Sequence, residues 1–261
     1  MFLPKVGWVK CKGLRKEFIG KIKTVTISYE AYQYHASILV DIEEQNIKKA
    51  THNNKAVGID VGVALMVADS NGSKVKPLEL MRELKKLRTK AQQLSRKKKG
   101  SNNRAKAKAK IAKQNLHIAN MRKDFLHKLS KSYSENQTVV VEDLKIKNMT
   151  KATKGTVEKP SKNASAKRGL NRAITQQSWG LFFELLEYKL IERGGELIKV
   201  NPKYTSQTCN KCGHISKENR KSQDKFVCTS CGHSANADIN ASKNILDRGI
   251  YGNNASLKIA V

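Results

Sequence analysis

Acidic residues are scarce in this sequence. The chain of 261 residues has 22 Asp and Glu against 51 Lys and Arg, which gives a formal net charge of +29 at pH 7. This excess is larger than solubility needs, and self-repulsion destabilises the compact state unless a polyanion neutralises the charge. Nucleic acid is the polyanion that the charge favours. A ribosomal-type or merely solvated basic protein is the alternative on charge alone.

Long hydrophobic runs are also absent. The longest apolar stretches, such as "AVGIDVGVALMVA" and "TVVVE", are too short or too interrupted to span a bilayer, and Met1 is not followed by a signal-peptide pattern. We therefore expect no membrane partner and a cytoplasmic location. Hydrophobic residues still make up 39% of the chain, which is enough for a core within one or two domains.

Cysteine is limited to five residues, four of which form two C-x-x-C pairs. This usage fits reducing conditions and a metal better than a disulfide framework. Two thiolate pairs separated by fifteen residues can close a tetrahedral Zn²⁺ site, and four ligands leave no open coordination position. We therefore expect a structural zinc, with redox dithiols as the alternative. The predicted zinc ligands are Cys209, Cys212, Cys228 and Cys231.

The residues beside these pairs support a zinc site. Gly213 and Gly232 follow the second cysteine of each pair, where a residue of positive φ closes a tight knuckle. His214 and His233 come next and are alternative ligands, although a complete cysteine set favours exposed histidines that face nucleic acid. Cys11 has no partner pair and is expected to be an ordinary side chain.

The first half of the chain predicts strands followed by helices. Residues 1–45 carry strand signals, and residues 56–74 predict a strand, a glycine-marked bend and a second strand with "SNG" as its turn. Residues 77–136 are helical in pattern, basic, and interrupted at "GSNN", so we expect a long helical hairpin that contacts phosphates; a solvated charged face is the alternative. The apolar face of the first module is predicted from the alternation of Tyr32, Tyr34, Ala36, Ile38 and Val40.

The second half predicts a central strand and a core helix. The β-branched run "TVVVEDL" at 138–144 is typical of a strand covered on both faces. Residues 145–172 have almost no large apolar residues and predict a basic, mobile loop. A helix through 174–193, ending at a glycine pair, and a strand at 196–202 follow. The helical spacing places six side chains in the core: Ile174, Trp179, Phe182, Phe183, Leu186 and Leu190.

Three widely separated acids form the second candidate site. Asp60 ends the strand "VGID", Glu142 ends "VVVE", and Asp238 opens the helix "ADINASKNILD". Acids at adjacent strand ends and at a facing helix start could converge, and such a cluster is costly unless divalent cations neutralise it. Two hard cations held by carboxylates activate water and stabilise the leaving oxygen in phosphodiester hydrolysis.

Each acid also fits an ordinary structural role when taken singly. Asp60 could be a turn former, Glu142 a surface charge at a strand end, and Asp238 a helix N-cap. The remaining acids that lie near these motifs are assigned ordinary roles: Asp143, Asp224 and Asp247.

Four motifs together resemble a known family. The stretches "GIDVGVALMVADSNG", "VVVEDLKIKNM", "NPKYTSQTCNKCGH" and "CTSCGHSANADINASKNIL" resemble, in order and spacing, the transposon-encoded TnpB (OrfB) proteins, relatives of type V CRISPR effectors. The resemblance implies an RNase H-like (RuvC) α/β core, an RNA-guided endonuclease that cuts DNA, and Asp60, Glu142 and Asp238 as the ligands of Mg²⁺ or Mn²⁺. It implies a transposon-derived guide RNA and a DNA target as partners, and a prokaryotic, nucleoid-associated setting.

The implied domain organisation has four parts. Residues 1–50 form a β-rich, barrel-like segment, and residues 51–206 form the first part of the nuclease core. An inserted zinc ribbon at 207–233 precedes the last part of the core at 234–261. Within the core, the basic helical segment would lie along the guide or heteroduplex, and residues 145–172 would form a lid beside the active site.

Two departures from the family pattern set the alternatives. The family's helical region that reads the motif beside the target is missing, since "LPKVGWVK" starts at residue 3, so we expect recognition parts to be absent. Asn236 stands where the family often has an acid. A non-catalytic nucleic-acid-binding remnant or regulator of transposition is the first alternative. A transposase proper is the second, although nothing here supplies a nucleophilic Tyr with paired His ligands.

Overall fold

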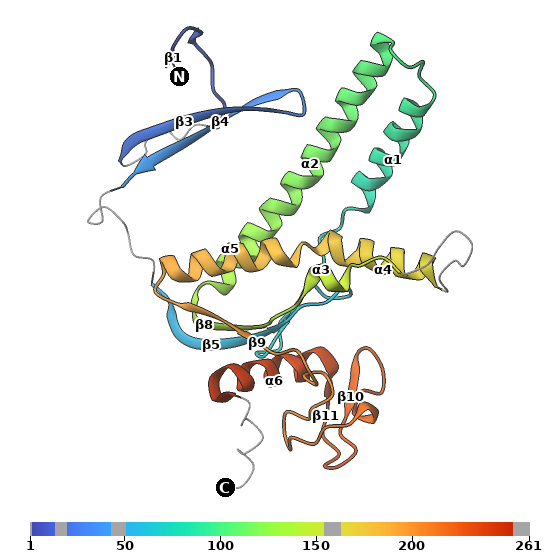
Figure 1. The fold of residues 1–261 in the computed structure, drawn as a ribbon. Coiled ribbons are helices and arrows are strands. Elements are labelled where there is room, and N and C mark those ends of the chain that lie inside the picture. Colours follow the sequence, from blue (N-terminus) through green and yellow to red (C-terminus); the bar gives the residue numbers. More distant parts are fainter. Residues whose placement is uncertain (1, 14–19, 43–50, 154–162, 253–261) are drawn as a thin grey trace.

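The computed structural model describes residues 2–13, 20–42, 51–153 and 163–252, and its centre is a mixed five-stranded sheet between helices (Figure 1). The strand order is β7-β6-β5-β8-β9. Strands β5, β8 and β9 run parallel, and β6 and β7 are antiparallel additions beyond β5. The strand bounds are Asn53–Asp60 (β5), Val67–Asp69 (β6), Lys74–Val75 (β7), Asn136–Glu142 (β8) and Glu196–Val200 (β9).

Strand β8 lies between β5 and β9 and is buried on both faces. Its residues Thr138 to Val141 are at most 8% exposed. A strand that has helices on both sides must present apolar side chains in both directions, which explains the unbroken run of valines. The prediction of a doubly covered strand at 138–144 is therefore confirmed.

Helices α5 (Trp179–Glu192) and α2 (Asn102–Tyr133) pack over one face of the sheet, and α6 (Ala237–Tyr251) packs over the other (Figure 1). The larger core lies on the α5 side, and all six residues of the predicted apolar stripe are buried there or at its margin. A smaller cluster on the α6 side joins β8, β9 and α6; its buried members are Val140, Val200 and Ile245.

Helix α6 approaches β5 unusually closely at Gly58. A Cβ atom on Gly58 would lie 2.2 Å from the carbonyl oxygen of Ser242, which is buried on α6. No real Cβ tolerates that distance to backbone, so glycine is required for the helix to reach the sheet. Because Gly58 precedes Asp60 by two residues on the same strand face, this contact also brings the acid beside α6.

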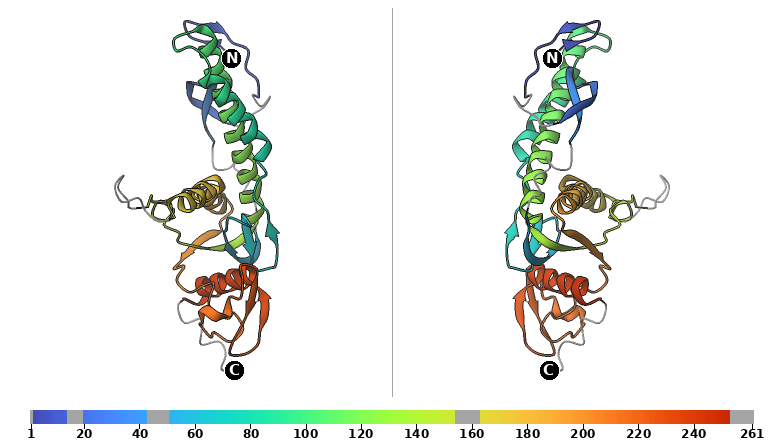
Figure 2. Two further views of the ribbon diagram at one scale, coloured as in Figure 1. Left: turned by 90° about the vertical axis from the view of Figure 1, so that its right-hand side faces the viewer. Right: turned by 90° about the vertical axis from the view of Figure 1, so that its left-hand side faces the viewer.

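The predicted helical hairpin is confirmed. Helix α1 (Met81–Ser95) and helix α2 are joined by a short connection in which Ser101 caps α2, its side chain accepting from the Arg104 amide. The buried residues of α2 lie from Gln114 onward, so α1 and the first part of α2 project away from the sheet (Figures 1 and 2). Gln114 joins the two helices, accepting from Lys90 Nζ at 2.5 Å and donating to Glu83 Oε2 at 2.8 Å.

The N-terminal residues form two separate two-stranded antiparallel ladders, which confirms the predicted strands. Strands β1 (Phe2–Leu3) and β2 (Gly7–Trp8) pair with each other, as do β3 (Lys21–Glu30) and β4 (Gln33–Asp41). Four of the five alternating residues lie on β4, whereas Tyr32 lies in the turn before it; only Ile38 and Val40 are partly buried, and Tyr34 is 78% exposed. Closure of these strands into a barrel-like segment stays a prediction.

Two predictions in the C-terminal half need correction. Residues 146–149 form the short helix α3 (Ile146–Met149) and α4 spans Ala164–Gln177, so a loop over 145–172 is wrong for these residues; positions 154–162 lie outside the described ranges. Helix α4 forms because its few apolar residues, such as Ile174, suffice for one packed edge. The helix predicted through 174–193 is divided, because Ser178 adopts a left-handed conformation (φ 56°) between α4 and α5.

Within the described ranges, no helix combines the length and the apolar character needed to cross a membrane.

Candidate metal centres

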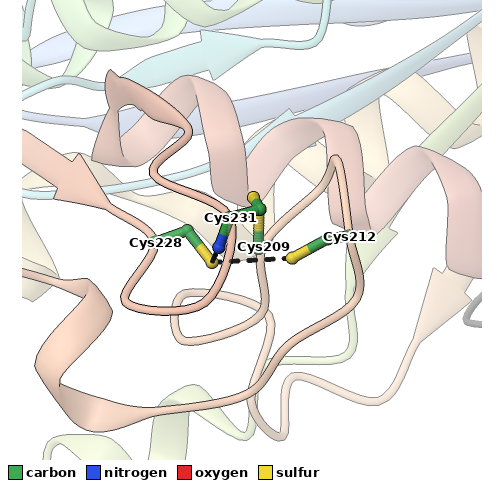
Figure 3. Close-up of side chains that lie close together, drawn as sticks. All are labelled: Cys209, Cys212, Cys228 and Cys231. Atoms are coloured by element: carbon green, nitrogen blue, oxygen red, sulfur yellow. Dashed lines mark hydrogen bonds between the residues drawn. The ribbon is translucent and has the colours of Figure 1, made fainter.

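The four predicted zinc ligands converge. One ligand atom from each of Cys209, Cys212, Cys228 and Cys231 lies within 4.8 Å of every other (Figure 3). The sulfur atoms of Cys209 and Cys231 are 3.8 Å apart, and those of Cys212 and Cys228 are 3.5 Å apart. Tetrahedral zinc with Zn–S bonds of about 2.3 Å needs sulfur atoms about 3.8 Å apart, so the donor set fits Zn²⁺.

The two C-x-x-C turns have the same hydrogen-bond pattern. The Cys209 amide donates to the His214 carbonyl at 2.9 Å, and the Cys228 amide donates to the His233 carbonyl at 2.8 Å. Gly213 and Gly232 donate back to the first cysteine of each pair, with φ of 73° and 72°. The positive φ predicted for the two glycines is thus confirmed. A side chain at either position would strain this turn.

Asn219 connects the two cysteine turns. Its side-chain amide donates to the carbonyls of Gln207 and His214, and its Oδ1 accepts from the amide and hydroxyl of Thr229. Asn219 is fully buried, so these bonds satisfy a side chain that would otherwise be costly to bury. The fold of the ribbon therefore holds the four thiols together through backbone and amide contacts as well.

The histidines are not part of the four-sulfur group. His214 Nδ1 lies 4.0 Å from Cys228 Sγ, and the group of mutually close ligand atoms among the described residues contains cysteines alone. Burial raises the pKa of the Cys209 thiol and raises that of Cys212 to about 12. A Zn²⁺ ion would supply the positive charge that makes these thiols thiolates.

The three predicted acids lie at one edge of the sheet. Asp60 ends β5 and Glu142 ends the parallel neighbour β8, so the two carboxylates leave the sheet at the same edge. Asp238 is the second residue of α6, which packs on β5. Asn236, rather than Asp238, caps this helix by accepting from the Ile239 amide. The N-cap interpretation of Asp238 is therefore wrong.

Electrostatics shows that the three acids interact. Burial, which is the largest cause, and the negative charges of Glu142 and Asp238 together raise the pKa of Asp60 to about 8, although Arg220 opposes them. The carboxylate oxygens do not all lie within 4.8 Å of one another, unlike the ligand atoms of the cysteine group. The acids are thus neighbours at one edge, and two of them, Glu142 and Asp238, each have a different side-chain partner.

Those partners are side chains that the sequence patterns did not single out. The buried Thr205 hydroxyl donates to Glu142 Oε1 at 2.5 Å, and Arg220 Nη2 lies 3.2 Å from Asp238 Oδ1. Burial raises the pKa of Glu142, and Thr205 and Arg248 oppose it. Burial also raises the pKa of Asp238 although Arg220 opposes it. Thr205 lies within a quoted motif, whereas no local signal marks Arg220.

The ribbon and the acidic edge are joined by α6. Asn244 Nδ2 donates to the carbonyls of Thr205 and Thr208, and Asn240 both accepts from the Asn210 amide and donates to Thr208. Arg220 itself lies between the two cysteine pairs. The folded ribbon therefore positions both partners of the acids, Thr205 and Arg220.

Two family profiles match the chain. The profile OrfB_IS605, described as "Probable transposase", matches residues 37–153, and "Cas12f1-like, TNB domain" matches residues 179–245. The second match contains all four cysteines, Arg220 and Asp238, and the first contains Asp60 and Glu142.

Similar proteins extend these matches along the chain. "Putative RNA-guided DNA endonuclease InsQ" of Escherichia coli (strain K12) is 43% identical over 95% of this chain and 62% of its own length. "Putative RNA-guided DNA endonuclease" of Streptomyces pristinaespiralis is 36% identical over 87% of this chain and 53% of its own length. A solved "CRISPR-Cas12f Ternary Complex" has a TM-score of 0.48 and 26% identity, over 82% of this chain and 42% of that one.

The chain thus spans between about half and two thirds of the length of these curated relatives. The profile matches include each of the four motifs that carry the family resemblance, which confirms it. The chain belongs to the TnpB/OrfB (IS605) family.

Proposed function

We propose that the chain acts as an RNA-guided, divalent-metal-dependent DNA endonuclease of a transposable element. The observation that carries the proposal is the convergence of Asp60, Glu142 and Asp238 at one edge of the sheet, where burial and mutual repulsion raise the pKa of Asp60 to about 8. A cluster of this kind in a chain of net charge +29 is suited to divalent cations and a phosphodiester.

The sheet order supports an RNase H-like (RuvC) core. Three consecutive strands, β5, β6 and β7, form an antiparallel meander, and β8 and β9 continue on the other side of β5 in parallel. This arrangement places the ends of the first and fourth strands side by side. Asp60 and Glu142 therefore come from adjacent strand ends. Helix α6, which covers one face of the sheet, adds Asp238.

Asp60, Glu142 and Asp238 would hold one or two Mg²⁺ or Mn²⁺ ions. When bound, such ions activate a water molecule and stabilise the leaving oxygen of the phosphodiester. Thr205 orients Glu142 by donating to Oε1, which leaves the other carboxylate oxygen to hold a cation. Arg220 pairs with Asp238 across 3.2 Å, and its guanidinium is placed to contact a phosphate once cations neutralise that acid.

The partners proposed are a transposon-derived guide RNA and a target DNA. The relative that is 43% identical is named as an RNA-guided DNA endonuclease. The projecting α1–α2 hairpin carries the run "RAKAKAKIAK" near the start of α2. The lysines of this run are exposed. Phosphate contacts by such side chains supply affinity, whereas pairing with the guide reads sequence.

The zinc ribbon is proposed to be structural. Four sulfur donors at the spacing of a tetrahedral site leave no open position for a reacting group. Its function would be to hold residues 204–220 against α6, because this segment supplies Thr205 and Arg220 to the acids.

A cleavage assay tests the proposal. Purified chain is mixed with RNA transcribed from the DNA that flanks its own reading frame, and with matched duplex or single-stranded DNA, in Mg²⁺, Mn²⁺ or neither. Cutting should need the metal, and should fall by several orders of magnitude in Asp60→Ala, Glu142→Ala and Asp238→Ala, with losses that do not add. Asp143→Ala is the matched control, because Asp143 pairs with Lys145 at the surface.

Metal-dependent cutting that persists in all three Ala variants would remove the acids from the reaction. Tight binding of RNA and DNA with no cutting under any condition would favour the non-catalytic remnant instead. Strand joining rather than hydrolysis would favour a transposase.

A further inference from the structure

A cavity lies beyond the acidic edge, on the α5 side of the sheet. It has a volume of about 550 Å³ and lies between the β5–β6 connection, the segment that leads into α1, the middle of α2 and the end of α4. This volume is within the range of about 300 to 1,000 Å³ typical of ligand sites. One wall is apolar and includes Leu65, Leu80 and Phe125.

A second cavity of about 430 Å³ adjoins the first, because both are lined by Arg122 and Gln176. All six residues that line it carry a polar group, and two of them are arginines. The other residues that line it are Thr150, Asn171, Arg172 and Thr175. The two cavities together have an apolar end and a polar, basic end, which is the chemistry of a site that takes a flat apolar ring attached to an anion.

Two buried polar atoms at this site have no hydrogen-bond partner. Arg122 Nε is buried without an acceptor, and Asn171 Oδ1 is buried without a donor. The Asn171 amide nitrogen donates to the carbonyls of Thr150 and Lys151, and this fixes which side of the amide is left free. Buried polar groups are normally hydrogen-bonded, so these two atoms can accept the polar groups of a ligand at this site.

The charge at the site is also unbalanced. Burial lowers the pKa of Arg122, and this guanidinium forms no ion pair with an acid of the described residues. Glu79 is the one acid among the residues that line either cavity, against Lys76, Arg122 and Arg172. A guanidinium in such surroundings favours a phosphate, with which it can form paired hydrogen bonds.

The cavity is connected to the acids by a short turn. Val61 donates its amide to Asp60, the Gly62 amide donates to the Leu65 carbonyl at 3.0 Å, and residues from Val63 to Met66 line the cavity. Gln177 Nε2 reaches the Val63 carbonyl at 3.5 Å and ties the turn to α4. The wall of the cavity therefore begins three residues after Asp60, at Val63.

We propose that the joined cavities bind one unpaired nucleotide of the nucleic-acid strand that passes the acidic edge. The base packs against Leu65, Leu80 and Phe125, and the Oδ1 atom of Asn171 and the side-chain amide of Gln176 meet its edge. The phosphate pairs with Arg122. Stacking on an aromatic ring and paired amide contacts are common ways to hold an unstacked base. The inference rests on the proposed function, since it takes the ligand to be part of a nucleic-acid strand.

Photocrosslinking tests the site. The full chain is irradiated with single-stranded oligothymidine that carries one 5-iodouracil, in buffer without added Mg²⁺ or Mn²⁺, and the crosslinked peptide is identified by mass spectrometry. We expect the crosslink at Phe125 and a yield about tenfold lower in Arg122→Gln, as for loss of a charge-assisted hydrogen bond. Gln176→Ala is a second variant, because Gln176 lines both cavities.

The matched control is Arg193→Gln. Arg193 lies at the far end of α5, where it donates to the Thr51 carbonyl, and it lines neither cavity. Its yield at Phe125 should equal that of the wild type. An unlabelled strand with bases should compete at least several times better than an abasic strand of equal length, because the abasic strand lacks the ring.

Crosslinks confined to the α1–α2 lysines or to the β3–β4 tyrosines would overturn the inference, as would equal yields in Arg122→Gln, Gln176→Ala and the wild type. The outcome is independent of cleavage. Crosslinking at Phe125 without any cutting would retain the nucleotide site and remove the nuclease proposal. Metal-dependent cutting without crosslinking in the cavity would do the reverse.

Discussion

The ionisation of Asp60 opposes folding when no metal is present. Burial and the charges of Glu142 and Asp238 raise its pKa from 3.8 to about 8. A carboxyl group whose pKa is raised by folding favours the folded state while it is protonated. This contribution to the free energy of unfolding is complete below the pKa of the unfolded state and is lost as the pH rises through the pKa of the folded state. The site is thus held in a state that a divalent cation would stabilise.

Asp60→Asn should therefore stabilise the metal-free protein. The gain in the free energy of unfolding should be near zero at pH 4, should grow with pH, and should reach on the order of 2 kcal/mol or more at pH 8. Chemical denaturation at several pH values measures it, with Asp143→Asn as the control at a neighbouring acid that pairs with Lys145 at the surface. Mg²⁺ should stabilise the wild type more than Asp60→Asn; equal effects of Mg²⁺ on both would contradict the metal assignment.

Thr205 provides a second test at the residue scale. Its hydroxyl donates to Glu142 and holds the pKa of that carboxyl down against burial. Thr205→Val should shift the rising limb of the pH–rate profile for cleavage to higher pH, with a loss of roughly tenfold near pH 7 that a higher pH restores. Thr208 lies in the same segment, but its hydroxyl donates to the Tyr204 carbonyl. Thr208→Val should therefore leave the pH–rate profile in place.

At the scale of elements, the zinc ribbon has little hydrophobic core, because its only ladder among the described residues joins two short strands, β10 (Lys225–Val227) and β11 (Ser234–Asn236). The ribbon is therefore stabilised by its thiols and by the hydrogen bonds of Asn219. Metal binding and folding of such a unit should be one event. The ribbon in turn presents Thr205 and Arg220 to the acids, so its folding and the order of the acidic edge are linked.

Cys209→Ser and Cys228→Ser should each lose the bound zinc, where the wild type carries one ion per chain. Elemental analysis of the purified proteins measures this, and Cys11→Ser is the matched control because Cys11 lies outside the cluster. Full zinc content in both ligand variants would show that the cluster is not the binding site.

The contact between α6 and β5 depends on the absence of a side chain at Gly58. Gly58→Ala would place Cβ 2.2 Å from the Ser242 carbonyl, so we expect a loss of about 3 kcal/mol or more of unfolding free energy. Gly169→Ala is the control: Gly169 lies in α4 with open space around it, and alanine there should be neutral or stabilising by about 0.5–1 kcal/mol. Thermal unfolding compares the two, and a neutral Gly58→Ala would contradict the close packing.

At the scale of the whole molecule, the hairpin of α1 and α2 projects from the sheet that carries the acids (Figures 1 and 2), and its sequence is rich in Lys and Arg. A strand of nucleic acid that contacts both would bridge the hairpin and the acidic edge. Many phosphates are then neutralised at once, and counterions are released from each of them.

Affinity for nucleic acid should therefore fall steeply with salt. If at least six phosphates are contacted, the dissociation constant should rise on the order of 10³-fold between about 50 and 200 mM salt. Fluorescence anisotropy with structured RNA and with duplex DNA measures the slope, and RNA should bind more tightly. A nearly flat plot would contradict extended phosphate contact.

Much of the fold was predictable from local patterns. The unbroken valines of β8, the glycine-flanked cysteine pairs and the helical spacing of the residues from Ile174 to Leu190 each report burial or turn geometry that depends on neighbouring residues. The error at 145–172 arose because α4 is amphipathic with few apolar residues, and its helix is stabilised by tertiary contacts such as Lys167 Nζ with the Met149 carbonyl.

The sequence by itself determined the residue types: four thiols in two knuckles, three acids at the ends of elements, and a large excess of positive charge. Tertiary structure alone decided which side chains meet these groups. Arg220 and Asp238 are 18 residues apart, and Thr205 and Glu142 are 63 apart, so no periodicity links either pair. Contacts of this kind depend on how α6 and the ribbon pack on the sheet, and the sum of many side-chain volumes sets that packing.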